Sequence, residues 1–444
     1  MINLFEHLDT DSLDFLRSQK IAGLNIPSIV MDDDGFLPAY VTSPVQYYCD
    51  FENNWKPLYF DKLSIPRFWR ITANAKEGKI FDLTKLRAQV VFYSADNSRF
   101  IKEVQWLDNK GIISWIDHYN SNGKKFAKTY YDNGKAVFKE FFANTGEVVI
   151  SHYLLSDNVF VNSPKYSGSF HSWTDFVTHY LQQKNLDLDH IIYNTLNKPF
   201  FLSLNLKDKG IDSLFWHEAI KNDLPGNMKF LMKEKTRTKH VFFQRYSDWV
   251  KYQQDLLRMK SNADFHFLGN IYPHPRGNKL RPNALILTNS DDIEHLTEII
   301  QELPNLHFYI AAITEMSQKL LNFAKYQNVS LYPNVTAKKV TELLSKCDFY
   351  FDINHYDEIF DAVRLAFEQN MLIVGFENTL HNRQFIAEEN IFDPNDIEGL
   401  SKKVLLALGN PLEMKKIIDQ QRQQAGDVSV KDYQQTFQVL MNER

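Results

Sequence analysis

The stretch "SNGKKFAKTYYDNGKAVFKEFFANTGEVV", residues 121–149, decides how the first half of this chain folds. Asn-Gly and Thr-Gly pairs mark its turns, and the glycines at 111, 123, 134 and 146 fall 12, 11 and 12 residues apart. Asn and Gly tolerate the positive φ of tight hairpin turns. Between the turns, aromatic residues alternate with the period of two that is typical of antiparallel strands. The pattern predicts a β-meander over roughly residues 80–156.

The meander is unusually rich in aromatic residues, including Tyr130, Tyr131, Phe141 and Phe142. An antiparallel sheet can leave one face in water, so aromatic residues on both faces indicate that the second face is covered. Two interpretations follow: a purely structural sheet without a ligand, or a docking surface for another protein.

Length and composition limit the class of protein. The chain has 444 residues, enough for two or three domains, and a formal net charge of −5 that does not favour nucleic-acid binding. Cys49 and Cys347 lie far apart without metal-ligand spacing, which favours a reducing cytoplasm and no disulfide. The N-terminus is not typical of a signal peptide, and no apolar run reaches the roughly 18 residues of a membrane span. We expect a cytoplasmic protein, with peripheral contact to the inner face of the membrane left open, and neither cofactor nor metal.

The C-terminal half, residues 274–444, alternates between apolar strands and amphipathic helices. The expected strands are "NALILTNS", "LHFYIAAI", "VSLYPNV", "DFYFDIN" and "MLIVGFEN", each followed by a helical segment. Strands and helices alternating at this spacing predict a parallel sheet with right-handed crossovers. This is a Rossmann-like domain, although no G-x-G-x-x-G motif is present.

The N-terminal half has the same α/β character on either side of the meander. Residues 1–70 and 161–273 are expected to form one Rossmann-like domain, interrupted by an inserted β-meander domain over residues 71–160. Two Rossmann-like domains with a ligand cleft between them are the expected assembly. The Pro-rich and basic stretch "HPRGNKLRPN", residues 274–283, is expected to be the linker.

This layout resembles the GT-B glycosyltransferases, most strongly at "DEIFDAVRLAFEQNMLIVGFENTLHNRQFI", residues 357–386. Retaining enzymes of the sucrose-synthase-like type carry there an acidic residue that holds the sugar and, after seven spacers, a Glu that holds the ribose. Anchoring on "MLIVGF" places Asp357 and Leu365 at these positions. A Leu accepts no hydrogen bond from a ribose diol. Glu358 and Phe360 also stand where those enzymes have glycines.

A second element of the donor site is altered as well. The enzymes that this chain resembles place an Arg and a Lys just after the first strand of the C-terminal domain, to neutralise the donor diphosphate. The corresponding segment here is "LILTNSDDIEHL", with Asp291, Asp292 and Glu294 but no Arg or Lys. Carboxylates would repel a diphosphate, so the donor site is altered at both ends.

With these features the chain resembles the GtfB-type non-catalytic subunit of the two-component O-GlcNAc transferase that modifies serine-rich repeat adhesins. The resemblance covers essentially the whole chain, including "MINLFE" and "GFENTLHNRQFI". It implies a heteromer with a catalytic GtfA-type GT-B subunit that binds UDP-GlcNAc. It also implies that this chain stabilises that subunit, as a chaperone does, and helps it bind the Ser/Thr-rich adhesin polypeptide before export by the accessory Sec system. The meander would be the domain through which the subunits associate.

Six residues are chemically suited to bind such an acceptor, because amide, imidazole, carboxylate and guanidinium groups hydrogen-bond to hydroxyl-rich peptides. They are Asn354, His355, Asp357, His381, Asn382 and Arg383. We interpret His217 and Glu218 in "LFWHEAI" as structural or cleft-lining, and Arg276, Lys279 and Arg281 as solvated linker residues or, less favoured, an anion site. No catalytic residue is expected.

Two alternatives stay open at this point. The chain could be an active retaining GT-B glycosyltransferase that uses a nucleotide sugar, with Asp357 or Glu358 holding the sugar. It could also be an interaction scaffold that never touches the acceptor. The missing Arg/Lys pair argues against the first, and the predicted cleft argues against the second.

Overall fold

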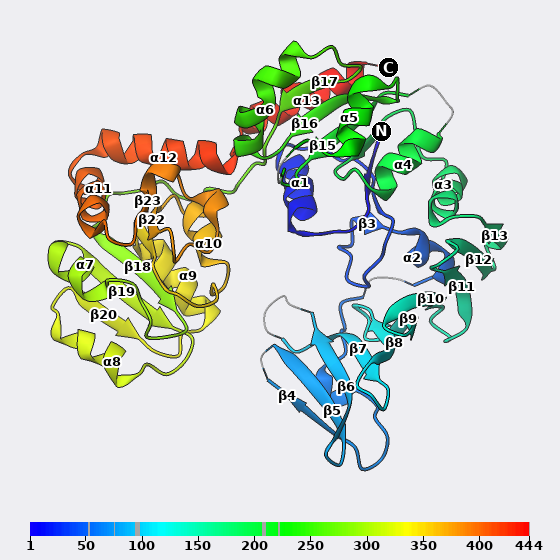
Figure 1. Ribbon diagram of the computed structural model, residues 1–444, viewed down its shortest axis with the longest axis horizontal. Helices are drawn as coiled ribbons and strands as arrows, with labels where there is room; N and C mark the ends of the chain where they lie inside the picture. The colour runs from blue at the N-terminus through cyan, green and yellow to red at the C-terminus, as the bar shows by residue number, and fades with distance from the viewer. Residues whose placement is uncertain (52–53, 75, 94–97, 207–209, 221–222, 444) are drawn as a thin grey trace. The chain divides into compact units, whose positions relative to one another are not determined.

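The computed structural model describes residues 1–443 except 52–53, 75, 94–97, 207–209 and 221–222 (Figure 1). The chain divides into two compact units. Unit 1 comprises Met1–Phe242, Asp255–His266 and Gln435–Arg444, and unit 2 comprises Phe243–Gln254 and Phe267–Gln434. The four-part domain division given above stays a prediction. Among the helices of the described residues, none combines the length and the apolar character needed to cross a membrane.

Unit 1 contains a seven-stranded sheet in the order β17-β16-β15-β14-β1-β2-β3. β1 pairs in parallel with both β14 and β2, so the order of the strands reverses beside β1. In open α/β sheets, ligands bind outside the carboxyl ends of the strands at such a reversal. The strands are β1 (Ile2–Phe5), β2 (Ser28–Val30), β3 (Val41–Thr42), β14 (Ile191–Tyr193), β15 (Asp212–Trp216), β16 (Thr238–Phe243) and β17 (Asp264–Phe267). The helices of this unit are α1 (Thr10–Ile21), α2 (Pro44–Cys49), η1 (Phe60–Lys62), α3 (Trp173–Gln183), α4 (Lys198–Asn205) and α5 (Gly226–Lys233). Two further helices, α6 (Tyr246–Arg258) and α13 (Val430–Asn442), have residues in both units.

The predicted meander is a ten-stranded antiparallel sheet in which sequence neighbours are also sheet neighbours (Figure 1). At the predicted turn, Asn133 and Gly134 both have positive φ, 48° and 76°. The sheet extends beyond the expected 80–156 and covers residues 70–170. The turns that lead to its outer strands use Leu83 and Asp157 at positive φ of 53° and 58°, and neither turn carries a glycine signal. The strands are β4 (Arg70–Ala73), β5 (Glu77–Asp82), β6 (Lys85–Phe92), β7 (Ile101–Leu107), β8 (Ile113–Tyr119), β9 (Lys125–Asp132), β10 (Lys135–Phe142), β11 (Val148–Tyr153), β12 (Asn158–Ser163) and β13 (Tyr166–Phe170).

One aromatic side chain from each strand between β7 and β12 joins a cross-strand row, which we call the aromatic ladder. Its members are Trp106, Trp115, Tyr130, Phe138, Tyr153 and Phe160. Ring centroids of directly contacting members lie 4.7–5.8 Å apart, and the Lys128 ammonium spans Trp115 and Tyr130. On the opposite face, Phe141 is buried and stacks on Trp173 of α3. Unit 1 itself therefore covers that face near β10, while the last two ladder residues are 47% and 49% exposed.

Unit 2 contains a six-stranded sheet in the order β20-β19-β18-β21-β22-β23, with parallel pairing throughout. All five strands expected in this half are present, and apolar clusters cover both faces of the sheet. The predicted class, α/β with two parallel sheets and an inserted antiparallel meander, is confirmed. The strands are β18 (Asn283–Thr288), β19 (His307–Ala312), β20 (Val329–Tyr332), β21 (Phe349–Asp352), β22 (Leu372–Phe376) and β23 (Ile391–Phe392). The helices are α7 (Leu296–Glu302), α8 (Gln318–Leu321), η3 (Asn322–Lys325), α9 (Ala337–Lys346), α10 (Ala362–Glu368), η4 (Arg383–Phe385), η5 (Glu388–Asn390), α11 (Ile397–Gly409) and α12 (Pro411–Ala425).

The segment 274–283, expected to be a solvated linker, is fastened to unit 2 by a buried carboxylate. Arg276 Nη1 and Arg281 Nη2 lie 2.6 and 2.7 Å from Oδ1 of Asp348, whose side chain is 0% exposed. The backbone N–H groups of Lys279 and Arg281 donate to Oδ2 at 3.0 and 2.9 Å. Burial alone would raise the pKa of Asp348, but its bonds to Arg281 and Arg276 hold that pKa below the usual value. The expectation of a solvated linker is therefore wrong for Arg276 and Arg281, because both guanidinium groups serve as structural partners of Asp348.

We predict that Asp348→Asn lowers the free energy of unfolding of unit 2 by about 3–5 kcal/mol, because two partly buried guanidinium groups lose their counter-charge. Hydrogen exchange of the unit-2 backbone amides across a urea series measures the change, because six of the seven tryptophans lie in unit 1 and do not report on unit 2. The exposed Lys279 is the matched control, and Lys279→Ala should alter stability by no more than about 0.5 kcal/mol. Equal stability of Asp348→Asn and the parent chain would show that the ion pairs do not fasten the segment.

Candidate functional site

The six residues predicted to bind an acceptor lie at the carboxyl edge of the unit-2 sheet, which we call the unit-2 edge. Three follow β21 and three follow β22: Asn354, His355 and Asp357, then His381, Asn382 and Arg383. The two strands are parallel neighbours, so their carboxyl ends bring both segments to the same edge. The Tyr356 carbonyl accepts hydrogen bonds from Asn354 Nδ2 at 3.3 Å and from His381 Nε2 at 2.5 Å. The structure thus brings the two segments into direct contact.

The loop after β18 packs on the loop after β21. The backbone N–H of Glu294 donates to the Ile353 carbonyl at 2.8 Å, and the N–H of His355 donates to the Asp292 carbonyl at 3.1 Å. This is the segment where GT-B enzymes of the resembled type carry an Arg and a Lys. Here it carries carboxylates, and main-chain bonds hold it against its neighbour.

His381 is the most strongly held of the six residues. Its Nδ1 lies 2.5 Å from Oδ1 of Asp352, a carboxylate that is 0% exposed, and its backbone N–H donates to Oδ2 at 2.9 Å. Burial alone would lower the pKa of this imidazole, but the hydrogen bond and charge of Asp352 raise it to about 9. The ring is therefore cationic at neutral pH, with both nitrogens donating to the protein itself.

Glu294 gathers a second set of partners at the same edge. Its Oε2 accepts from His355 Nε2 at 2.5 Å and from Asn378 Nδ2 at 3.1 Å, and its Oε1 lies 3.1 Å from His295 Nε2. The Glu294 carboxylate, which lies in the segment where cations were expected, thus binds His355 and contacts His295 of the same chain.

The remaining pair, Asn382 and Arg383, is bound locally as well. The Asn382 side chain accepts from the backbone N–H of Gln384, the start of η4. Arg383 forms two ion pairs, from Nη1 to Glu377 Oε2 at 2.8 Å and from Nη2 to Glu388 Oε2 at 2.7 Å, and its side chain is 50% exposed. Arg383 also borders a cavity of about 240 Å³ within unit 2. The charge of Arg383 is therefore both paired and accessible.

The two positions that matter for a nucleotide sugar have different surroundings. Leu365 lies on α10 and packs against the apolar cluster that contains Phe367 and Phe385. Glu358 accepts the backbone N–H of Val363 at 2.8 Å, and burial raises the pKa of its carboxyl. Leu365 therefore packs in an apolar environment, and the alignment on "MLIVGF" predicts it to stand where a ribose would need an acceptor.

A second polar group lies at the carboxyl edge of the unit-1 sheet, which we call the unit-1 edge. His217 Nε2 lies 3.5 Å from Asp9 Oδ2. Asp9 Oδ1 accepts a hydrogen bond from the backbone N–H of Ser12 at 2.8 Å, and Asn194 Nδ2 donates to Ser12 Oγ at 2.8 Å. Within the described residues, three buried atoms here lack a partner: Asn194 Oδ1, Thr195 Oγ1 and His217 Nδ1. Buried polar atoms normally meet protein, ordered water or ligand. This edge therefore offers an amide oxygen, a hydroxyl and an imidazole nitrogen to a ligand.

His217 is predicted from sequence to be structural or cleft-lining. Its ion pair with Asp9 agrees with a structural role, and its other nitrogen has no partner in the described part of the chain. Asn194 and Thr195 were passed over. The available signal was their position, since each follows an apolar strand of an α/β sheet, where such sheets bind ligands.

Four family models match consecutive parts of the chain. They are the GtfB N-terminal domain (residues 2–48), the GtfB middle domain (69–171), the GtfB third domain (173–256) and the GftB/GlyA-F C-terminal domain (284–421). The middle domain coincides with the ten-stranded meander.

Several curated relatives match over nearly the full length. The protein named UDP-N-acetylglucosamine–peptide N-acetylglucosaminyltransferase stabilizing protein GtfB from Limosilactobacillus reuteri subsp. suis is 51% identical over 446 residues, covering 100% of both chains. The protein of the same name from Streptococcus gordonii is 37% identical over 446 residues and covers 99% of each chain.

A solved structure agrees with this assignment. A chain in the crystal structure of a GtfA/B complex bound to UDP and GlcNAc matches with a TM-score of 0.92 and 37% identity, covering 99% of both chains. The predicted GT-B-like fold is thereby confirmed. The chain belongs to the GtfB family of UDP-N-acetylglucosamine–peptide N-acetylglucosaminyltransferase stabilizing proteins.

Proposed function

We propose that this chain is the non-catalytic subunit of a protein O-GlcNAc transferase, which stabilises a catalytic GtfA-type subunit and binds the Ser/Thr-rich acceptor polypeptide. The observation that carries the proposal is full-length similarity to stabilizing proteins, together with a unit-2 edge in which Glu294 and Asp352 bind histidines of the same chain. This function places the chain in the cytoplasm, where the acceptor is made.

The alternative, an active retaining glycosyltransferase, requires cations for a diphosphate. The segment that would supply them carries Asp291, Asp292 and Glu294, and Glu294 already binds His355. Leu365 offers no hydrogen bond to a ribose. The electrostatics and the hydrogen-bonding capacity of the unit-2 edge both favour the non-catalytic function.

We place the docking surface for the catalytic subunit on the meander. Tyr153 and Phe160 end the aromatic ladder and are 47% and 49% exposed, next to Leu155 at 77%. Exposed aromatic residues on a rigid sheet are typical of the centres of protein interfaces. The meander also packs on α2 and α3 of unit 1, so deleting it would damage that unit, and point substitutions are the sharper test.

We predict that Tyr153→Ala with Phe160→Ala weakens co-purification of a GtfA-type partner by about tenfold or more, because interface aromatics often contribute 2 kcal/mol or more each. Pull-down and calorimetry on the folded double variant measure the effect. Leu412→Ala, at a 78% exposed position of unit 2, is the control that should leave the association unchanged. Partner affinity equal to that of the parent chain would remove the ladder from the interface.

Acceptor binding would rely on many weak contacts. A Ser/Thr-rich peptide offers hydroxyl and amide groups but little apolar area, and each hydrogen bond contributes roughly 0.5–1.5 kcal/mol net. Ordering a disordered peptide also costs free energy, which favours modest affinity and rapid release. Of the six residues of the unit-2 edge, His355, Asp357 and Arg383 are exposed and supply groups of the required kind. Asn354 is only 2% exposed, and both ring nitrogens of His381 bond within the chain.

We predict that Asn382→Ala with Arg383→Ala weakens binding of an unglycosylated Ser/Thr-rich peptide severalfold and leaves association with the partner intact. Fluorescence anisotropy with a labelled peptide measures the affinity. The control is Glu398→Ala with Lys402→Ala, an exposed ion pair of 2.5 Å on α11 of the same unit. An unchanged affinity would exclude the unit-2 edge as the acceptor site, and a loss with Asn194→Ala alone would move that site to the unit-1 edge.

A further inference from the structure

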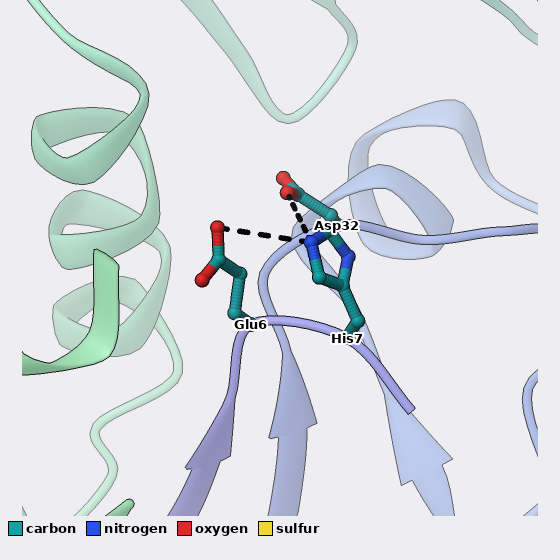
Figure 2. A group of neighbouring side chains, drawn as sticks. All are labelled: Glu6, His7 and Asp32. Carbon is teal, nitrogen blue, oxygen red and sulfur yellow. Dashed lines mark ion pairs between the residues drawn. The ribbon is translucent and has the colours of Figure 1, made fainter. Parts of the chain in front are cut away.

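Three side chains with metal-binding atoms converge where β1 and β2 end (Figure 2). Glu6 and His7 directly follow β1, and Asp32 lies just beyond β2. The two strands are parallel neighbours, and the backbone N–H of Asp32 donates to the Glu6 carbonyl at 3.0 Å, which sets the two carboxylates side by side. His7 Nε2 lies 3.7 Å from Glu6 Oε1 and 3.7 Å from Asp32 Oδ2.

These separations suit a metal ion. All three ligand atoms lie within 4.8 Å of one another, so a point equidistant from them is about 2.0–2.4 Å from each. Zinc binds imidazole nitrogen and carboxylate oxygen at roughly 2.0–2.2 Å. One imidazole with two carboxylates is a donor set that first-row transition metals use, and it leaves coordination positions open. The His7 side chain is 63% exposed, so an ion can reach the group from solvent.

A lysine from α4 already holds a positive charge against the same oxygens. Lys198 Nζ lies 2.5 Å from Asp32 Oδ2 and 3.7 Å from Glu6 Oε1. The ammonium shows that the carboxylates attract a cation, and it also stands in the way of a metal ion because like charges repel. Its side chain is 37% exposed on a flexible stem, so it can move into solvent when an ion enters.

We propose that Glu6, His7 and Asp32 form a binding site for a divalent transition-metal ion, with Zn²⁺ as its test ligand, and that Lys198 competes with the ion for the two carboxylates. The site lies at the unit-1 edge, outside the residues proposed for acceptor binding. A bound ion would turn its open positions toward oxygen atoms of a ligand at that edge. The expectation of a chain without a metal site would then not hold.

Calorimetric titration of Zn²⁺ into the full-length chain, purified without a histidine tag, tests the proposal. One site per chain is expected, with the visible absorption of bound Co²⁺ as a second readout. His7→Ala removes an exposed ligand without disturbing the core and should weaken binding by about tenfold or more. Lys198→Met removes the competing ammonium and should strengthen binding by about tenfold. His171→Ala, at another exposed histidine of unit 1, is the matched control.

The proposal is supported if Zn²⁺ binding weakens in His7→Ala, strengthens in Lys198→Met and is unchanged in His171→Ala. Absence of Zn²⁺ binding to the parent chain overturns the proposal, even if Lys198→Met binds the ion, because the ammonium then closes the site. Binding that is unaffected by His7→Ala also overturns it, because the ion then lies elsewhere.

Discussion

The ion pair between Asp352 and His381 is the constraint on which the unit-2 edge depends. A carboxylate with no solvent exposure requires a cation, and the chain supplies it from the segment after β22. Once His381 is held there, its Nε2 binds the Tyr356 carbonyl and fixes the loop after β21. The loop after β18 then packs on that segment through Glu294 and His355. Asp352 and Glu294 thus each bind an imidazole from a neighbouring loop of the same chain.

This arrangement explains how a GT-B-like fold can persist without donor chemistry. A nucleotide sugar would need cationic side chains that are free to bind its phosphates. In this edge, the imidazoles of His355 and His381 and the guanidinium of Arg383 already bind carboxylates of the same chain. Arg383, for example, is shared between Glu377 and Glu388. The fold keeps both parallel sheets and the polar loops at their carboxyl edges, and the inserted sheet carries the aromatic ladder.

Much of the fold could be predicted from sequence, because the signals are local. The Asn133-Gly134 turn and the alternation around it define a hairpin without reference to the rest of the chain, and the five strands of unit 2 are short apolar runs. The outermost strands extend beyond the meander pattern expected over 80–156, because the turns that lead to them use Leu83 and Asp157, which carry no glycine signal. Arg276 and Arg281 were expected in solvent because their partner, Asp348, lies about seventy residues away in sequence.

The candidate sites were harder to predict for the same reason. The positions of Asn354 and His381 at one edge follow from the strand order, but their internal pairing depends on loops that no pattern specifies. Glu6 and Asp32 meet only because β1 and β2 are neighbours, and their spacing in sequence resembles no known metal motif.

The central claim is that the unit-2 edge has lost donor binding because its charges are satisfied internally. Calorimetric titration of UDP and of UDP-GlcNAc into the isolated chain, beside the same titrations into the purified catalytic partner, tests it most directly. The account predicts binding heat for the partner and none for this chain. A micromolar dissociation constant of this chain for UDP or UDP-GlcNAc would contradict the claim and would favour the alternative that the chain is an active glycosyltransferase.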